Sequence, residues 1–259
     1  MAETAMSILI AYVLGDGIVF AADKNLTAPP SGGVPRRQVP GQKILGWPNK
    51  LALVGYVGAA KVASGQRMEL WLQDFIARHP TVTVPSSVAH DLKNELQVAM
   101  GPAAGASIVE FAAFANVGGV NVPEYWHIAN VHGINNATGK YDPPQAYFGC
   151  SEELLGHWAA GIPPAQLRGR LQTRADNYDP QWFHNSIELV VFNWLEAGAK
   201  AAFRGLQSQG FLAKPTGLAD WEKHAAFWVL QFAAYFEAFY PNGQHYVGGG
   251  ADTLSIPWP

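Results

Sequence analysis

The run from Ser7 to Asp23 constrains the fold of this chain more than any other segment. It reads Ser-Ile-Leu-Ile-Ala-Tyr-Val-Leu-Gly-Asp-Gly-Ile-Val-Phe-Ala-Ala-Asp. Residues 8–14 and 18–22 are short, apolar and partly β-branched, which is typical of strands. Gly-Asp-Gly at 15–17 supplies the positive φ angle that a tight hairpin turn requires. An antiparallel hairpin would place Ser7, at the start of one strand, beside Asp23, at the end of the next.

Apolar periodicity predicts the other elements. Helices are expected over 61–78, 86–100, 152–157, 186–207 and 221–240, with Ser86 or Ser87 as the N-cap of the second. Strands are expected over 106–115, 125–131, 146–149 and 252–256, with turns at Gly118-Gly119 and 135–139. No charged or Ser/Pro-rich linker divides the chain, so one domain over 1–259 is expected.

Composition excludes several classes of function. The 259 residues are 49% hydrophobic, enough for a substantial core. Lys and Arg number 17 against 20 acidic residues, a net charge of −3, which argues against nucleic acid or a membrane surface as a partner. The apolar stretch 225–240 is shorter than the roughly 20 residues of a membrane span.

The single cysteine and the first residues indicate a compartment. Cys150 has no partner for an internal disulfide, which favours a reducing environment, and it is interpreted as a small buried residue. Residues 1–6 lack the basic and apolar regions of a secretory signal. A cytoplasmic location is therefore expected.

The motifs resemble those of a known family. Proteasome β-type subunits open on a threonine that begins the first strand, turn at Asp-Gly, and end the second strand with Ala-Ala-Asp. In this chain the same order, without a gap, is Ser7, Asp16-Gly17, Asp23 and Thr27. Lys43-Ile44 looks like the family's active-site Lys-Ile, and the segment 54–60 resembles its oxyanion glycine segment. The resemblance is to N-terminal nucleophile (Ntn) hydrolases.

That resemblance implies an α+β fold, the four-layer αββα sandwich of proteasome-like subunits. It covers about the first 60 residues well, 105–155 loosely and the last 40 in outline. Residues 1–6 then correspond to a leader removed by autoprocessing, and about 168–215 to a divergent insertion. The family's Gly-Ser-Gly turn appears as Gly149-Cys150-Ser151, in which Cys150 occupies the position of the serine and Ser151 is expected to substitute for it.

The chemistry explains why these residue types belong together. A serine hydroxyl needs a base within hydrogen-bond reach, and a free α-amine, with a pKa of about 7.7–8.0, can supply it. Once the leader is removed, Ser7 would carry both nucleophile and base. Lys43, held by Asp23, would favour the deprotonated hydroxyl. The Gly55 N–H would stabilise the oxyanion, with Ser151 as a further catalytic residue and Thr27 binding substrate.

Two functions follow from the resemblance. The first is a peptidase or amidohydrolase that acts on a peptide or a small amide and, as the resemblance implies, assembles as a ring-shaped homo-oligomer. The second is a catalytically silent subunit that serves in assembly or binding and keeps its leader; Met6 and Cys150 favour this alternative. No cofactor is implied. No metal site is implied either, because His127 and His132, five apart in a strand-like segment, would face opposite sides.

Overall fold

The computed structural model describes residues 7–27, 38–102, 105–135, 140–154, 162–186, 189–239 and 248–259. Its strands are β1 (Ile8–Val13), β2 (Gly17–Asp23), β3 (Asn25–Thr27), β4 (Gln38–Pro40), β5 (Ile44–Gly46), β6 (Ala52–Gly58), β7 (Ser107–Val117), β8 (Val120–Ala129), β9 (Ile134–Asn135), β10 (Lys140–Tyr141), β11 (Gly149–Glu152), β12 (Gln181–Ser186) and β13 (Ala251–Pro257). Its helices are the 3-10 turn η1 (Pro48–Lys50), α1 (Met68–Arg78), α2 (Pro85–Met100), α3 (Pro164–Asp176), α4 (Leu189–Ser208) and α5 (Leu218–Phe239).

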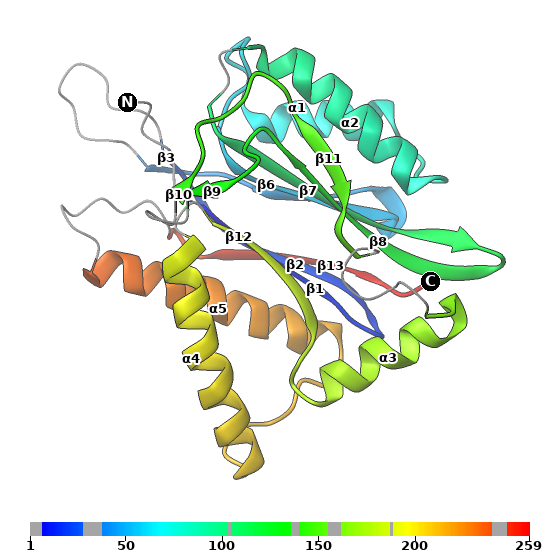
Figure 1. The fold of residues 1–259 in the computed structure, drawn as a ribbon, viewed down its shortest axis with the longest axis vertical. Helices are drawn as coiled ribbons and strands as arrows, with labels where there is room; N and C mark the ends of the chain where they lie inside the picture. Colours follow the sequence, from blue (N-terminus) through cyan, green and yellow to red (C-terminus); the bar gives the residue numbers. More distant parts are fainter. Residues whose placement is uncertain are drawn as a thin grey trace.

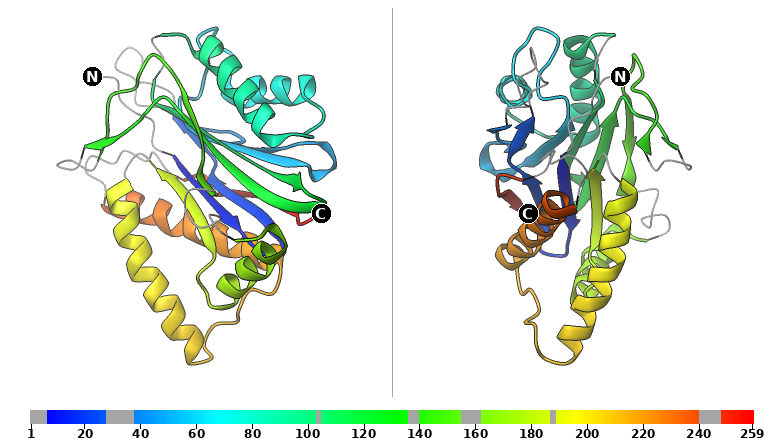
Figure 2. Two further views of the ribbon diagram at one scale, coloured as in Figure 1. Left: turned by 45° about the vertical axis from the view of Figure 1, so that its right-hand side comes forward. Right: turned by 90° about the vertical axis from the view of Figure 1, so that its left-hand side faces the viewer.

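Two antiparallel sheets form the centre of the molecule. One has the strand order β12-β1-β2-β13 and the other β11-β8-β7-β6-β5, while β3-β4 and β9-β10 are small two-stranded pairs. Helices α1 and α2 lie outside the five-stranded sheet, and α4 and α5 lie outside the four-stranded one (Figure 1). Two further views show the same order of layers (Figure 2). The chain therefore has the α+β, four-layer αββα architecture that the sequence predicted.

Alternation along the strands explains why the layers stack. In β1, Ile8, Ile10 and Tyr12 pack toward α5, whereas the residues between them face the other sheet. Successive side chains of a strand point to opposite faces, so a strand that is apolar at every position is buried on both. The described residues accordingly hold a separate apolar cluster at each of the three interfaces between layers.

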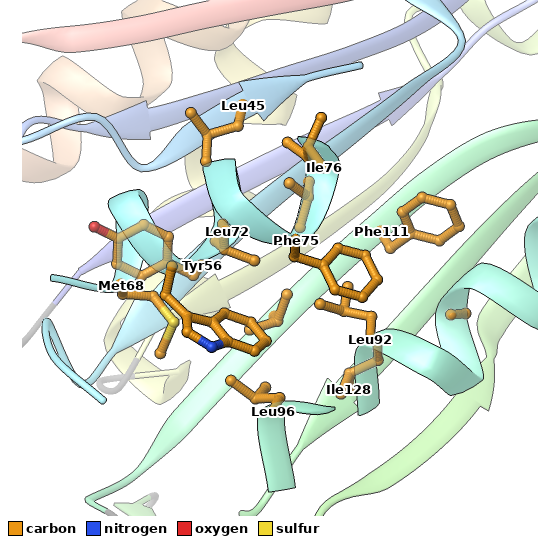
Figure 3. Packing of buried hydrophobic residues seen from close by; sticks show 14 of the residues in the cluster. Leu45, Tyr56, Met68, Leu72, Phe75, Ile76, Leu92, Leu96, Phe111 and Ile128 are labelled. Carbon is orange, nitrogen blue, oxygen red and sulfur yellow. The ribbon is translucent and has the colours of Figure 1, made fainter. Parts of the chain in front are cut away.

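Aromatic and aliphatic side chains fill the interface between α1, α2 and the five-stranded sheet. Phe75 and Leu72 of α1 meet Leu92 of α2 above Phe111 of β7 (Figure 3). Trp47 closes one side of this cluster, with its ring centroid 5.4 Å from that of Phe111. Apolar residues at helical spacing thus fix the position of both helices on the sheet.

The predicted hairpin is confirmed. β1 and β2 pair antiparallel, with Leu9 opposite Ala22 and Val13 opposite Ile18. Gly17 has a φ of 151°, and an added Cβ would lie 2.2 Å from the Ile256 carbonyl oxygen, so the turn requires glycine. The hairpin fixes which residues meet at its open end.

Several predicted boundaries are wrong. The helix expected over 61–78 begins only at Met68, because the preceding loop turns at Gly65, which has a φ of 89°. The helix expected from Ser86 begins at Pro85, and its N-cap, Val84, makes no side-chain cap hydrogen bond. Proline suits the first turn because it has no N–H to leave unpaired there.

Within 146–157 the strand boundary was predicted incorrectly. The strand expected at 146–149 is β11, over Gly149–Glu152, and the helix expected from Glu152 begins one residue later, at Glu153. β11 adds an edge strand to β8, with Cys150 opposite Ile128. Residues 155–157 lie outside the described residues, as do residues 1–6.

The segment expected to be an insertion contributes to the sandwich itself. It supplies β12, which pairs antiparallel with β1 along six positions. It also supplies most of α3, whose Leu171 is buried between the two sheets, and α4, which begins at Leu189 rather than at Ser186. The sequence prediction missed both α3 and β12.

Candidate active site

The structure brings together Ser7, Asp23 and Lys43. Ser7 precedes β1, Asp23 ends β2 and Lys43 immediately precedes β5, so all three lie at one end of the sandwich. The Ile8 N–H donates to Asp23 Oδ1 across the hairpin at 2.9 Å. This bond fixes the carboxylate beside Ser7, as the hairpin argument predicted.

Lys43 connects the other two residues. Its Nζ donates to Asp23 Oδ1 at 2.8 Å and to Ser7 Oγ at 2.9 Å. Its backbone carbonyl accepts the Tyr56 N–H at 3.1 Å, which anchors the start of β5 to β6. Exposure is 3% for Ser7, 0% for Asp23 and 1% for Lys43, so the three polar groups satisfy one another inside the protein.

Burial determines the electrostatics of this group. Loss of hydration raises the pKa of the Asp23 carboxyl, against the opposing effects of the Lys43 charge and of hydrogen bonds from Lys43, Ile8 and Gly248. Burial likewise lowers the pKa of the Lys43 ammonium, against the effect of Asp23. A lysine with a lowered pKa gives up a proton more readily than one in water. Lys43 is thus better suited to proton exchange with Ser7 than a solvated lysine would be.

The predicted oxyanion role of Gly55 does not fit the sheet. The Tyr56 N–H donates to the Lys43 carbonyl on the β5 side of β6. Just past the end of β6, the Ala59 N–H donates to the Ala106 carbonyl on the β7 side. Hydrogen-bonding directions alternate along an antiparallel strand, so Gly55, which is opposite Glu110, directs its N–H into the ladder with β7. Its Cα faces the other sheet, where an added Cβ would lie 2.8 Å from Leu9 Cδ1. Gly55 is a packing glycine.

The backbone N–H of Gly58, unlike that of Gly55, points away from β7. Gly58 ends β6 with a φ of 99°, and the same alternation turns its N–H away from β7, toward the side of β6 on which Lys43 lies. An added Cβ would lie 2.1 Å from the Ala106 carbonyl oxygen, so only glycine fits. The glycine segment predicted from the sequence includes Gly58, but the oxyanion role was given to Gly55. Strand parity, which the sequence alone does not show, distinguishes the directions of the two N–H groups.

Ser151 is not part of this group. It lies on β11, the edge strand at the far side of the sheet from β5, and four strand spacings of about 4.8 Å amount to roughly 19 Å. Its exposed hydroxyl donates to Glu153 Oε1 at 2.5 Å. The segment predicted as an active-site turn, Gly149-Cys150-Ser151, is instead a strand paired with β8, and its side chains alternate between the two faces of the sheet. Cys150, the inward one, packs against the α2 side of the sheet.

Thr27 ends β3 and pairs with Gln38 of β4, two residues beyond Asn25. The backbone therefore places it next to the hairpin that carries Asp23.

The structure adds Gly248 and Asn25 to the site. The Gly248 N–H donates to Asp23 Oδ2 at 3.4 Å, and its carbonyl accepts the N–H groups of Lys24 and Asn25. Asn25 is buried, and the run Gly248 to Gly250 has positive φ throughout. The sequence prediction named neither Gly248 nor Asn25 as part of the site. The three consecutive glycines were the feature of the sequence that could have indicated this contact, because glycine lets another segment of backbone approach closely.

Neither a metal centre nor a membrane span is found among the described residues. In that part of the chain, no three His, Cys, Asp or Glu side chains lie close enough together to hold a metal ion. No described helix combines the length and the hydropathy needed to cross a bilayer. The side chains that meet at Ser7 supply a hydroxyl, an amine and a carboxylate.

The fold and this group together define a four-layer αββα sandwich with a buried Ser-Lys-Asp cluster at one end. No family model and no curated protein matches this chain. Sixty-six chains of solved structures match it. Among them is a Gly-1 mutant of Anbu from Hyphomicrobium sp. strain MC1, with a TM-score of 0.45 and 12% sequence identity over 97% of this chain and 82% of that chain.

Proposed function

We propose that this protein is an amide or peptide hydrolase of the proteasome-like Ntn type, with Ser7 as its nucleophile. The observation that carries the proposal is the pair of short hydrogen bonds from Lys43 Nζ, one to Ser7 Oγ and one to Asp23 Oδ1. A buried lysine on a serine hydroxyl stabilises its deprotonated form. The sequence resemblance adds that the serine acts once it is the first residue.

The reaction proceeds by acyl transfer. Removal of residues 1–6 frees the Ser7 α-amine, which accepts the proton of the hydroxyl as Oγ attacks the amide carbonyl carbon. The C–N bond breaks, and the leaving amine takes that proton. Water, deprotonated by the same α-amine, then hydrolyses the ester and restores Ser7. The Gly58 N–H, rather than that of Gly55, is the proposed donor to the oxyanion.

Each remaining residue acts through Ser7. Lys43 places a positive charge beside the hydroxyl, and Asp23 keeps Lys43 in place while the Ile8 and Gly248 N–H groups hold Asp23. We also propose a cytoplasmic homo-oligomer, ring-shaped as the resemblance implies, that encloses this end of the sandwich. Light scattering of the purified protein would test the assembly.

The second candidate is a silent subunit that uses the sandwich for assembly or binding. The near-complete burial of Ser7 favours it, because a substrate carbonyl has to reach Oγ. Specific hydrolysis of a peptide by the purified chain would reject this candidate.

The test compares Ser7→Ala with Ser7→Thr, which keeps a hydroxyl. We expect Ser7→Ala to abolish leader removal, turnover and labelling by a β-lactone, and Ser7→Thr to retain all three. Ser87→Ala, the same substitution at an exposed position of α2, is the matched control and should leave leader removal, turnover and labelling unchanged. Turnover that persists in Ser7→Ala would overturn the proposal.

A further inference from the structure

A second line of polar side chains crosses the five-stranded sheet away from Ser7. Glu110 of β7 is opposite His127 of β8, which in turn is opposite Ser151 of β11. Residues that oppose one another on neighbouring strands project from the same face of a sheet. A carboxylate, an imidazole and a hydroxyl therefore stand side by side on three adjacent strands.

The inner two groups form a fixed pair. His127 Nδ1 lies 2.7 Å from Glu110 Oε1, and Glu110 is fully buried between the two sheets. Burial lowers the pKa of His127, but the charge of Glu110 and its hydrogen bond outweigh this, so the pKa is raised overall. With Nδ1 engaged toward β7, the ring presents Nε2 away from Glu110. A carboxylate that holds Nδ1 in this way sets the tautomer and orientation of a general base.

The outer group is a hydroxyl that solvent can reach. Ser151 is exposed, and the His127 side chain is 28% exposed, in contrast to the buried Ser7. Strand alternation makes Ser151 and His127 a hydrogen-bonded backbone pair, with Cα atoms about 5.5 Å apart. The hydroxyl donates instead to Glu153 Oε1 at 2.5 Å. Rotation about the Ser151 Cα–Cβ bond gives the hydroxyl two other staggered positions besides the one that faces Glu153.

We propose that Ser151, His127 and Glu110 form a second nucleophilic site that reacts with small activated esters, separate from Ser7. Ser151 Oγ attacks the ester carbonyl while His127 Nε2 takes its proton. The C–O bond to the alcohol breaks, and the alcohol leaves with that proton. Water repeats the sequence on the acyl-serine and releases the acid. Glu110 is a positioning residue, and Glu153 holds the hydroxyl in its resting orientation.

The experiment uses the Ser7→Ala protein, so the proposed function and this site fail separately. The probes are a fluorophosphonate, located by peptide mapping, and 4-nitrophenyl acetate, followed as the release of nitrophenolate. We expect label on the peptide that contains Ser151, at least a tenfold loss of ester hydrolysis on adding Ser151→Ala, and a several-fold gain on adding Glu153→Gln. Ser87→Ala is the matched control. Absence of label from Ser151, or hydrolysis unchanged by Ser151→Ala, overturns the proposal.

The role of Glu110 has its own readout. Because Glu110 raises the pKa of His127, Glu110→Gln should shift the labelling profile of Ser151 toward lower pH, where an unpaired histidine becomes neutral. Glu153 and Tyr125 also face this pair, and both stay unchanged in that variant. A purely structural role for Glu110 would lower the amount of folded protein without moving the midpoint. An unmoved midpoint in folded Glu110→Gln protein contradicts the positioning role.

Discussion

Replacing Lys43 by methionine tests whether the buried pair with Asp23 is as tightly coupled as its geometry indicates. Methionine fills nearly the same volume, so the change removes the charge and the two hydrogen bonds from a side chain that is 1% exposed. Removing one partner of a buried ion pair leaves the other charge uncompensated and typically costs about 3–5 kcal/mol. Asp23 keeps the Ile8 and Gly248 N–H groups, so we expect about 3 kcal/mol, the lower end of that range.

The assay is urea unfolding at pH 7 of wild type, Lys43→Met, Asp23→Asn and the double variant. Because the double variant leaves no unpaired charge, its loss should fall short of the sum of the two single losses by at least about 2 kcal/mol. Lys24 and Asp252 form an exposed pair at 2.9 Å, and Lys24→Met should cost no more than about 1 kcal/mol. Additive losses for Lys43 and Asp23 would refute the reasoning.

Three further predictions rest on other parts of the chain. Gly58→Ala should cost about 2–4 kcal/mol in urea unfolding, since its Cβ would meet the Ala106 carbonyl at a positive φ, whereas Gly118→Ala, at positive φ in open space, should cost only about 1 kcal/mol; equal losses would contradict this. Burial lowers the pKa of His224 to about 4, so the neutral form of this histidine adds stability above pH 6.5, and that stability is lost as the pH falls toward 4. Between pH 6.5 and 4 the free energy of unfolding of the wild type should fall by about 3 kcal/mol, and that of His224→Gln by far less. Urea unfolding at each pH measures both. Burial raises the pKa of Cys150 to about 11, so its reaction with a disulfide reagent at pH 8 should be at least 100-fold slower than that of a free cysteine, and a rate near that of free cysteine would show that the thiol is accessible.

The sequence predicted the elements that carry strong local signals. The hairpin from Ile8 to Asp23 combines β-branched strands with a glycine turn that tolerates no other residue, so local and tertiary preferences agree there. Helices α2 and α5 likewise have apolar residues at helical spacing. Because the hairpin also fixes the neighbours of Ser7, the pairing of Ser7 with Asp23 followed from the same pattern.

The failures have tertiary causes. β12 contains Trp182, Phe183 and polar residues without a clear alternation, and it is a strand because β1 offers it an edge. The N–H groups of Gly55 and Gly58 point to opposite sides of β6, and which side each faces depends on how β6 pairs with β5 and β7. Ser151 was assigned by its place in a motif, whereas its position is set by pairing with β8. None of these pairings can be read from one segment alone.

The most direct test of the central claim, that Ser7 acts as an N-terminal nucleophile, is the intact mass of freshly purified protein with N-terminal sequencing. Our account predicts a chain that begins at Ser7 in wild type and in Ser7→Thr, and one that retains residues 1–6 in Ser7→Ala. A wild-type chain that keeps residues 1–6 through prolonged incubation, with the Ser7 amine still in a peptide bond, would contradict it.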